Sequence, residues 1–331
     1  MRQQIPEPLV KRPGDWLVRF NQRVPRVLDV DLIHTLSHRG LVYCVQFSHD
    51  GKYVATGSYH SAQIYDVFSG EKICILQDDN VDATSDLYVR SVYFSPDDKY
   101  LATGSEDKLI RIWDIANRTI LNTFVGHENA IYSLAFSLNG KILMSGGGDR
   151  TVRLWDIETS INILTLTLED SVTSVAFSPD TNYIAASWNL LWRLGGPDGH
   201  EDNIYSIALS PTGELVSGSL DKTIKMWELS LSPLSIAGDT AQNEGRCIKT
   251  FKGHKDYVRS VAFTPDANWV ISGSTDQDVQ FWDARTGESQ LTLKGHTATL
   301  ISVAASPTGQ LFATGSGDRT ARIWSYGAPA Q

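Results

Sequence analysis

Apolar and polar residues alternate in short runs along the whole chain, and turn-forming residues separate the runs. One stretch contains, in order, YSLAFS (132–137), ILMSG (142–146), TVRLWDI (151–157) and ILTLT (163–167). A period of two residues is typical of strands that bury one face, and Gly, Asn, Asp or Pro between such runs predicts tight turns. The pattern therefore predicts an all-β protein built from short antiparallel strands.

The same pattern recurs at intervals. Five near-copies of one segment are SEDKLIRIWDI (105–115), GGDRTVRLWDI (147–157), SLDKTIKMWEL (219–229), STDQDVQFWDA (274–284) and SGDRTARIWSY (316–326). Alignment on the last apolar residue of a preceding SVxF-like run gives seven units, at Phe47, Phe94, Phe136, Phe177, Leu209, Phe263 and Ala305. Most intervals are close to 42 residues, a spacing at which each unit forms one four-stranded propeller blade. We therefore predict a seven-bladed β-propeller.

The repeats set the expected domain boundaries. We expect an N-terminal lead-in over residues 1–25 and a propeller over 26–326, with blades at about 38–76, 87–125, 126–168, 169–194, 200–251, 253–293 and 295–326. The last unit ends soon after its third strand. We predict that residues 29–36 supply its fourth strand and thereby close the ring, since an unpaired sheet edge invites aggregation.

The fourth unit is irregular. Only 32 residues separate Phe177 from Leu209, and no Asp-to-Trp segment lies between them. We expect this blade to lack its third strand, with neither Trp188 nor Trp192 replacing the missing Trp. Segments 77–87 and 230–246 are surplus and predict surface loops.

Composition narrows the function classes. The net charge of −9 argues against a nucleic-acid-binding surface, which needs basic residues to neutralise phosphates. Three separated cysteines, Cys44, Cys74 and Cys247, indicate neither a disulfide framework nor a metal cluster. No apolar run is long enough to span a membrane, and the N-terminus has no secretory signal. No cofactor motif is present.

A set of polar residues repeats together with the Trp. Each of four units contains a His, a Ser or Thr, an Asp and a Trp, and we predict one buried hydrogen-bonded tetrad per unit. The sets are His127/Ser145/Asp149/Trp155, His200/Ser217/Asp221/Trp227, His254/Ser272/Asp276/Trp282 and His296/Thr314/Asp318/Trp324. The second unit keeps Thr103, Asp107 and Trp113 without the His. Because a catalytic triad would not occur four times, we interpret these residues as structural and predict no enzyme. His34, His38, His49 and His60 have no metal-ligand spacing.

These units resemble WD repeats. Segments 14–57, 85–115 and 126–157 also resemble the C-terminal propeller of the fungal Tup-type transcriptional corepressors, and the lead-in VPRVLDVDLIHTLSH (24–38) is the most specific match. The resemblance implies a nuclear, non-enzymatic propeller that binds DNA-binding repressors, with histone tails and deacetylases as further partners. The family's N-terminal coiled coil tetramerises and contacts an adaptor; no matching heptad segment occurs here, so we expect this chain to lack those functions.

We expect a partner to bind the top face, where strand starts and turns reach the central channel. The candidate contacts at strand starts and turns are Tyr43, Tyr88, Arg90, Glu106, Tyr132, Tyr205, Tyr257 and Arg259, and the family resemblance implies contacts at Tyr88, Ser91, Glu106 and Tyr205. Tyr and Arg are enriched at interface hot spots, although a Tyr at a strand start can equally cap the blade core. Thr275 and Ala298 stand where the family has Lys and Asn. The alternative function is a generic WD scaffold in another complex, such as ubiquitin-ligase substrate recognition or RNA processing.

Overall fold

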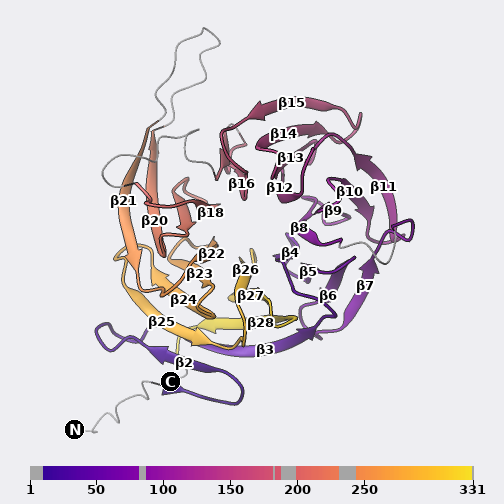
Figure 1. The fold of residues 1–331 in the computed structure, drawn as a ribbon. Helices are drawn as coiled ribbons and strands as arrows, with labels where there is room; N and C mark the ends of the chain where they lie inside the picture. The colour runs from indigo at the N-terminus through magenta and orange to yellow at the C-terminus, as the bar shows by residue number, and fades with distance from the viewer. Residues whose placement is uncertain (1–9, 82–86, 182, 188–198, 231–243, 330–331) are drawn as a thin grey trace, which may run out of the picture.

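Seven antiparallel sheets stand around a central channel and form a β-propeller (Figure 1). The computed structural model describes residues 10–81, 87–181, 183–187, 199–230 and 244–329, and these residues contain 28 strands and no helix. We number the sheets by the order of their innermost strands along the chain. The innermost strands contact one another in sequence, and the last, β26, contacts the first, β4. The ring is therefore closed.

The first three sheets each contain four strands in sequence order. Sheet 1 contains β4 (Cys44–Phe47), β5 (Tyr53–Gly57), β6 (Ala62–Asp66) and β7 (Lys72–Leu76). Sheet 2 contains β8 (Val89–Phe94), β9 (Tyr100–Ser105), β10 (Ile110–Asp114) and β11 (Thr119–Phe124). Sheet 3 contains β12 (Ile131–Phe136), β13 (Ile142–Gly147), β14 (Thr151–Asp156) and β15 (Asn162–Thr167).

Sheet 4 is the smallest. Its described residues form two strands, β16 (Val175–Phe177) and β17 (Ile184–Ala186), paired antiparallel. Trp188 and Trp192 lie outside the described residues, as does most of the surplus segment 230–246. Sheet 5 has four strands, β18 (Ile204–Leu209), β19 (Leu215–Ser219), β20 (Thr223–Ser230) and β21 (Glu244–Lys252).

The two ends of the chain meet in sheet 7. It contains β26 (Leu300–Ala305), β27 (Leu311–Ser316), β28 (Thr320–Gly327) and, as its outermost strand, the N-terminal β3 (Asp29–Ser37). β3 pairs antiparallel with β28 from Thr320↔Ser37 to Gly327↔Asp29. The segment 29–36 thus occupies the outer edge of the last sheet and joins both ends of the chain in one hydrogen-bonded ladder.

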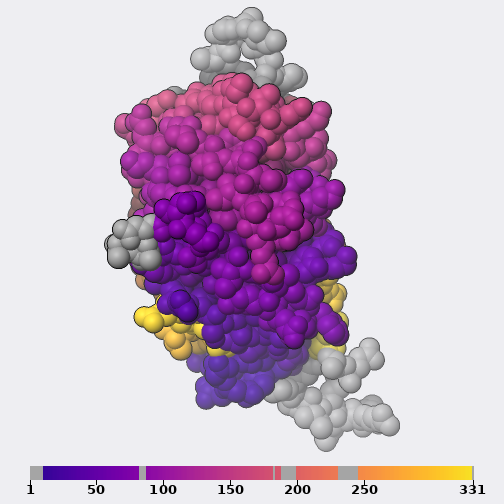
Figure 2. Space-filling model, turned by 90° about the vertical axis from the view of Figure 1, so that its right-hand side faces the viewer, coloured from indigo at the N-terminus to yellow at the C-terminus, as the bar shows by residue number. Residues whose placement is uncertain are grey.

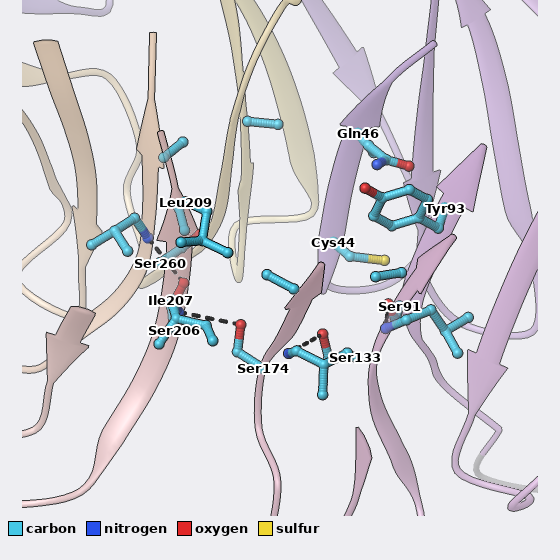
Figure 3. Close-up of a pocket in the computed structure, with 18 of the residues that line it drawn as sticks. Cys44, Gln46, Ser91, Tyr93, Ser133, Ser174, Ser206, Ile207, Leu209 and Ser260 are labelled. Carbon is cyan, nitrogen blue, oxygen red and sulfur yellow. Dashed lines mark hydrogen bonds between the residues drawn. The ribbon is translucent and has the colours of Figure 1, made fainter. Parts of the chain in front are cut away.

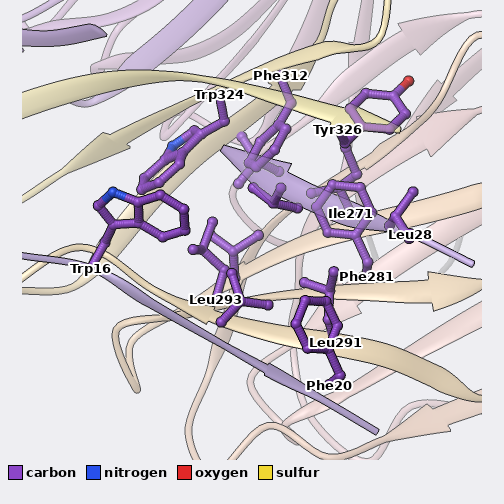
Figure 4. Packing of buried hydrophobic residues seen from close by; sticks show 14 of the residues in the cluster. Trp16, Phe20, Leu28, Ile271, Phe281, Leu291, Leu293, Phe312, Trp324 and Tyr326 are labelled. Carbon is purple, nitrogen blue, oxygen red and sulfur yellow. The ribbon is translucent and has the colours of Figure 1, made fainter. Parts of the chain in front are cut away.

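Sheet 6 has more strands than the repeat predicts. To β22 (Val258–Phe263), β23 (Trp269–Ser274), β24 (Asp278–Asp283) and β25 (Ser289–Lys294) the lead-in adds β2 (Leu17–Phe20) and β1 (Val10–Lys11). The sequence analysis placed residues 1–25 in a lead-in that precedes the repeats. Burial accounts for the two added strands, because Trp16, Val18 and Phe20 join an apolar cluster with residues of sheets 6 and 7 (Figure 4).

The core lies between neighbouring sheets. The Trp that closes each repeated segment is almost fully buried, and Trp155, Trp227, Trp282 and Trp324 are among the largest buried side chains. Figure 2 shows the closely packed outer wall of the ring, turned by 90° from Figure 1. On this wall the outer strands alternate, so Ile73 and Ile75 of β7 are exposed whereas Cys74 between them is buried. The period of two seen in the sequence is therefore the period of burial.

Candidate functional site

The seven innermost strands surround a channel of about 880 Å³. One residue at or just before the start of each strand lines this channel, and we call these seven the rim residues: Tyr43, Arg90, Tyr132, Thr173, Tyr205, Arg259 and Ile301. We call the face that carries them the top face. Each rim residue comes directly before the residue whose side chain hydrogen-bonds to the neighbouring sheet. The backbone pairing of the strand therefore fixes the direction in which the rim side chain projects. Five of the predicted contact residues are rim residues.

A cluster of aromatic and charged side chains occupies the rim at sheets 1 and 2. The guanidinium carbon of Arg90 lies 4.2 Å from the ring centroid of Tyr43 and 5.8 Å from that of Tyr88. The two tyrosine rings meet edge to face, 5.2 Å apart. Arg90 also forms an ion pair with the Glu106 carboxylate. Tyr88 is thus not itself a rim residue; it supports Arg90 and Tyr43 from the side.

A second cluster lies at sheets 5 and 6. The guanidinium carbon of Arg259 is 3.7 Å from the ring centroid of Tyr205. Tyr257, two residues earlier in the chain, is 42% exposed. A cation on an aromatic face is attracted by the ring quadrupole, so each arginine holds the ring of the preceding sheet in place. The top face therefore presents pre-arranged rings rather than free side chains.

The structure corrects one predicted contact residue. Ser91 is buried, and its hydroxyl oxygen accepts a hydrogen bond from the Leu134 backbone N–H at 3.0 Å. It therefore joins sheet 2 to sheet 3 and is not available at the surface. Of the remaining predicted contacts, Tyr43, Arg90, Tyr132, Tyr205 and Arg259 line the channel. Tyr88 and Glu106 contact Arg90, and Tyr257 is exposed two residues before Arg259.

Ser91 belongs to a set that the sequence analysis missed. In six of the seven units, the serine at the corresponding position accepts a hydrogen bond from the next sheet's backbone N–H, at 3.0 to 3.2 Å. Figure 3 labels five of these serines, from Ser91 to Ser260. We call these six residues the serine ring: Ser91, Ser133, Ser174, Ser206, Ser260 and Ser302. The signal was present in the sequence, because six of the seven units carry Ser at this position.

The junction between sheets 1 and 2 is built differently. Cys44 replaces the serine, and burial raises the pKa of its thiol to about 12. The Gln46 side-chain oxygen accepts the Phe94 N–H at 2.9 Å instead. Gln46 and Tyr93 also stand at a position that is Ala in the other five innermost strands, namely Ala135, Ala176, Ala208, Ala262 and Ala304. This side of the channel is therefore the bulkiest.

The four tetrads form continuous hydrogen-bonded chains. In sheet 3 the Trp155 indole and the His127 Nε2 lie 2.8 and 2.7 Å from the Ser145 hydroxyl, and the His127 Nδ1 lies 2.8 Å from Asp149. An indole can only donate and a carboxylate can only accept. The protons therefore point from Trp through Ser and His to Asp. The other three sets show the same contacts.

The central hydroxyl of each of these three tetrads is inaccessible from outside. Ser217, Ser272 and Thr314 each have an exposed fraction of 0%. Each hydroxyl oxygen lies 2.7 Å from the His Nε2 of its own tetrad and 2.8 to 3.0 Å from the Trp indole nitrogen. The sequence analysis assigned Ser217, Ser272 and Thr314 to buried structural tetrads and not to the partner-binding face. They belong to the interior of sheets 5, 6 and 7 and not to the candidate binding site.

Hydrogen bonding stabilises the charged form of the tetrad carboxylates. Burial alone would raise the pKa of Asp276, but the hydrogen bond and charge of His254 and backbone N–H donors lower it to about 2. The pKa values of Asp149, Asp221 and Asp318 are lowered in the same way. Burial lowers the pKa of His127, which favours the neutral ring. The Ser–His–Asp hydrogen bonds thus connect strands of one sheet, and the Asp carboxylate also accepts hydrogen bonds from backbone N–H groups.

Sheets 1 and 2 have their own versions of this network. In sheet 1 the His38 Nε2 lies 2.8 Å from the Thr56 hydroxyl and 3.3 Å from the Tyr65 hydroxyl, with Tyr65 in the place of the Trp. In sheet 2, where the His is absent, the buried Arg111 pairs with Asp107 at 2.7 Å and with Asp78 at 3.0 Å. Asp78 comes from the acidic surplus segment, so part of that segment is anchored.

The described part of the chain contains no group of three or more His, Cys, Asp or Glu side chains that could hold a metal ion. Cys44, Cys74 and Cys247 are free thiols. Within the same residues, no helix is long and apolar enough to cross a membrane.

Comparison with known proteins gives matches to one repeat family and to several transcriptional repressors. The model of the family "WD domain, G-beta repeat" matches residues 30–66, 80–114, 118–156, 161–194, 188–228, 245–283 and 287–325. The chain is 61% identical to "Transcriptional repressor rco-1" of Neurospora crassa over 87% of its length, which is 50% of the relative. It is 40% identical to "General transcriptional corepressor TUP1" of Saccharomyces cerevisiae, with the same two coverages. "Transcriptional repressor tup12" of Schizosaccharomyces pombe is 50% identical over 80% of the chain and 46% of the relative. The chain thus spans about half the length of these relatives.

Proposed function

The chain belongs to the WD domain, G-beta repeat family, and we propose that it acts as the protein-binding propeller of a transcriptional corepressor. The observation that carries the proposal is the ring of tyrosines and arginines at the channel mouth, in a chain 61% identical to a transcriptional repressor. The proposed activity is binding without chemistry. Its site of action is the nucleus, and its partners are DNA-binding repressors, with histone tails and deacetylases as further candidates.

The physical character of the top face supports binding of an extended protein segment. Tyr43, Tyr132 and Tyr205 offer large ring surfaces with little side-chain entropy to lose, and the stacked arginines reduce that loss further. The channel below the rim is about 880 Å³, which accommodates several side chains of a partner segment. A net charge of −9 makes a nucleic-acid ligand unfavourable, so the DNA contact belongs to the partner.

We also infer that the seven sheets are seven blades, of which the fourth is reduced. The supporting observation is that the serine ring passes through the fourth sheet: Val175 N–H donates to Ser133, and Ile207 N–H donates to Ser174, at 3.0 and 3.2 Å. The two-stranded sheet therefore occupies a full position in the ring. On this inference the propeller runs from about residue 26 to 326, with residues 10–25 as an added outer edge.

A pull-down from fungal nuclear extract tests the proposal. The bait is the full chain, and the matched control is the chain with Tyr132→Ala and Tyr205→Ala, two rim residues from different sheets. Enrichment of DNA-binding repressors or deacetylases on the wild-type bait alone supports the proposal. Recovery of ubiquitin-ligase subunits or RNA-processing factors instead favours the alternative, a WD scaffold in another complex.

A further inference from the structure

Two arginine–tyrosine pairs occupy equivalent places on the rim. Arg90 of sheet 2 lies over Tyr43 of sheet 1, and Arg259 of sheet 6 lies over Tyr205 of sheet 5, with guanidinium-to-ring distances of 4.2 and 3.7 Å. In both cases the arginine comes from β8 or β22 at the same strand position and the tyrosine from the preceding sheet. The two pairs are therefore two copies of one arrangement.

The two copies differ in one side chain. Glu106 N–H donates to the Tyr88 carbonyl at 3.1 Å, and Thr275 N–H donates to the Tyr257 carbonyl at 2.9 Å, so Glu106 and Thr275 hold matching turn positions. Glu106 forms an ion pair with its arginine. Thr275 carries no charge, and within the described residues no carboxylate forms an ion pair with the arginine of sheet 6.

Among the residues that the structure describes, Arg259 is thus a cation held in place without an anion. Its Nε atom is buried and has no hydrogen-bond partner among the described residues. An unsatisfied buried donor costs free energy, and a guanidinium stays charged at any physiological pH. Stacking on Tyr205 fixes the plane of the guanidinium. A planar fork of donors in fixed orientation matches the geometry of a carboxylate.

We propose that Arg259 binds an Asp or Glu side chain of the partner segment, in the position that Glu106 fills beside Arg90. This inference rests on the proposed function, because it assigns a partner contact on the same top face. The structure itself provides the template, since the sheet 2 pair shows which group completes the arrangement. The two arginines of the rim then differ: Arg90 is neutralised by Glu106, whereas Arg259 selects a segment with an acidic residue near sheet 6.

A peptide carboxylate fits better than a nucleic-acid phosphate. Binding of a nucleic-acid backbone requires many cations along its path. At the rim the only other arginine, Arg90, is already paired with Glu106 among the described residues. One unpaired guanidinium beside exposed tyrosines suits one acidic side chain among apolar neighbours.

The test uses two probe peptides, acetylated and amidated hexaglutamate and hexaglutamine, with the full chain labelled with ¹⁵N-arginine. We expect hexaglutamate to shift the Arg259 Nε–H resonance and to leave that of Arg90 in place. Hexaglutamine should shift neither. Inorganic phosphate at the same total charge is the third probe, and it should bind at least about tenfold more weakly than hexaglutamate.

Three variants make the test specific. Arg259→Gln should weaken hexaglutamate binding by about tenfold or more, since a charge-assisted pair is lost. Thr275→Glu should do the same by supplying an internal carboxylate, as Glu106 does in sheet 2. Glu106→Thr should create a second site, so that hexaglutamate now also shifts Arg90. Melting temperatures near that of the wild type would show that each variant is folded.

Unchanged hexaglutamate affinity in Arg259→Gln would overturn the proposal, and so would equal shifts with hexaglutamine. Tighter binding of phosphate than of hexaglutamate would overturn the assignment to a carboxylate. These failures differ from failure of the proposed function, because a top face that captures repressors through its tyrosines alone would still pass the pull-down test.

Discussion

The indole of Trp16 meets the indole of Trp324 edge to face, with 5.5 Å between the ring centroids and 84° between the planes. This contact connects the lead-in to the Trp of the sheet 7 tetrad, near the other end of the chain. Around it, Phe20 and Leu28 pack against residues of sheets 6 and 7 (Figure 4). The lead-in is therefore part of the folded core that closes the ring.

We expect Trp16→Ala to lower the free energy of unfolding by about 3 kcal/mol or more, since truncation of a buried Trp leaves a large cavity. Val10→Ala, in the same lead-in but 49% exposed, is the matched control and should change stability by less than about 0.5 kcal/mol. Denaturant titration of both variants provides the measurement. Equal stability of the two would mean that the lead-in contributes nothing to the core.

The tetrad hydrogen bonds give a second prediction. Asp149→Ala removes the acceptor of the His127 Nδ1–H and of the Glu128 backbone N–H. Because buried donors are then left unpaired, we expect the free energy of unfolding to fall by about 1–3 kcal/mol. Glu158→Ala, at an exposed turn of the same sheet, is the control. A melting temperature for Asp149→Ala that equals the control's would contradict the network.

The serine ring predicts that removal of one hydroxyl group between two sheets lowers the free energy of unfolding. Ser133→Ala leaves the Val175 N–H, at the joint between sheets 3 and 4, without its acceptor. We expect a loss of about 1–3 kcal/mol in unfolding free energy. Ser171→Ala, on the loop before β16, removes a hydroxyl outside the ring and should be nearly neutral. Hydrogen exchange at Val175 offers a direct check, and unchanged protection there would refute the role assigned to Ser133.

The propeller architecture could be predicted because its causes are local and repeated. Alternation of apolar residues and the Asp-to-Trp segment recur in the sequence with a period near 42 residues. The tetrad sets were also predictable, since each needs four residue types at fixed offsets within one unit. The position of β3 beside β28 could be predicted for a similar reason. The last unit lacks its fourth strand, and residues 29–36 form a strand-like run that precedes the first unit.

The remaining features depend on contacts between units, which no single repeat encodes. Arg111 forms an ion pair with Asp78, which lies in the surplus segment 77–87. In sheet 1, Tyr65 stands in place of the Trp and contacts His38. Neither arrangement has the His, Ser or Thr, Asp and Trp of the four tetrads. Ser91 was assigned to the surface from the family resemblance, without regard to the Ser that recurs at this position in six of the seven units. The geometry of the neighbouring strands places Arg90 at the rim and turns the side chain of the following residue, Ser91, toward sheet 3.

His38 gives a prediction about pH. Burial lowers the pKa of its ring to about 4 in the folded protein, below the usual 6.5. Between these values the unfolded chain binds more protons than the folded one, so stability must decrease as pH falls from about 6.5 to about 4. The expected contribution of His38 is on the order of 1–3 kcal/mol over this range. Urea titrations of the wild type and of His38→Gln between pH 7 and 4 measure it, and parallel pH profiles would refute the assignment.

The last prediction concerns the tyrosines of the top face. Tyr88 and Tyr205 come from sheets 2 and 5, and each supports an arginine at the channel mouth, at 5.8 and 3.7 Å. If the top face binds a repressor, each ring contributes buried aromatic area, so Ala substitution should weaken binding by about 1–2 kcal/mol or more. Folding should change little, because both side chains are partly exposed at strand starts.

Tyr53 is the control for this prediction, since it packs against the core between sheets 1 and 2 on the strand side away from the rim. Tyr53→Ala should lower the melting temperature and leave affinity for a repressor recovered in the pull-down unchanged. Binding titrations and melting curves of the three variants separate the two roles. If Tyr88→Ala and Tyr205→Ala bind normally but melt at lower temperature, these tyrosines cap the sheets, and partner binding must lie elsewhere on the ring.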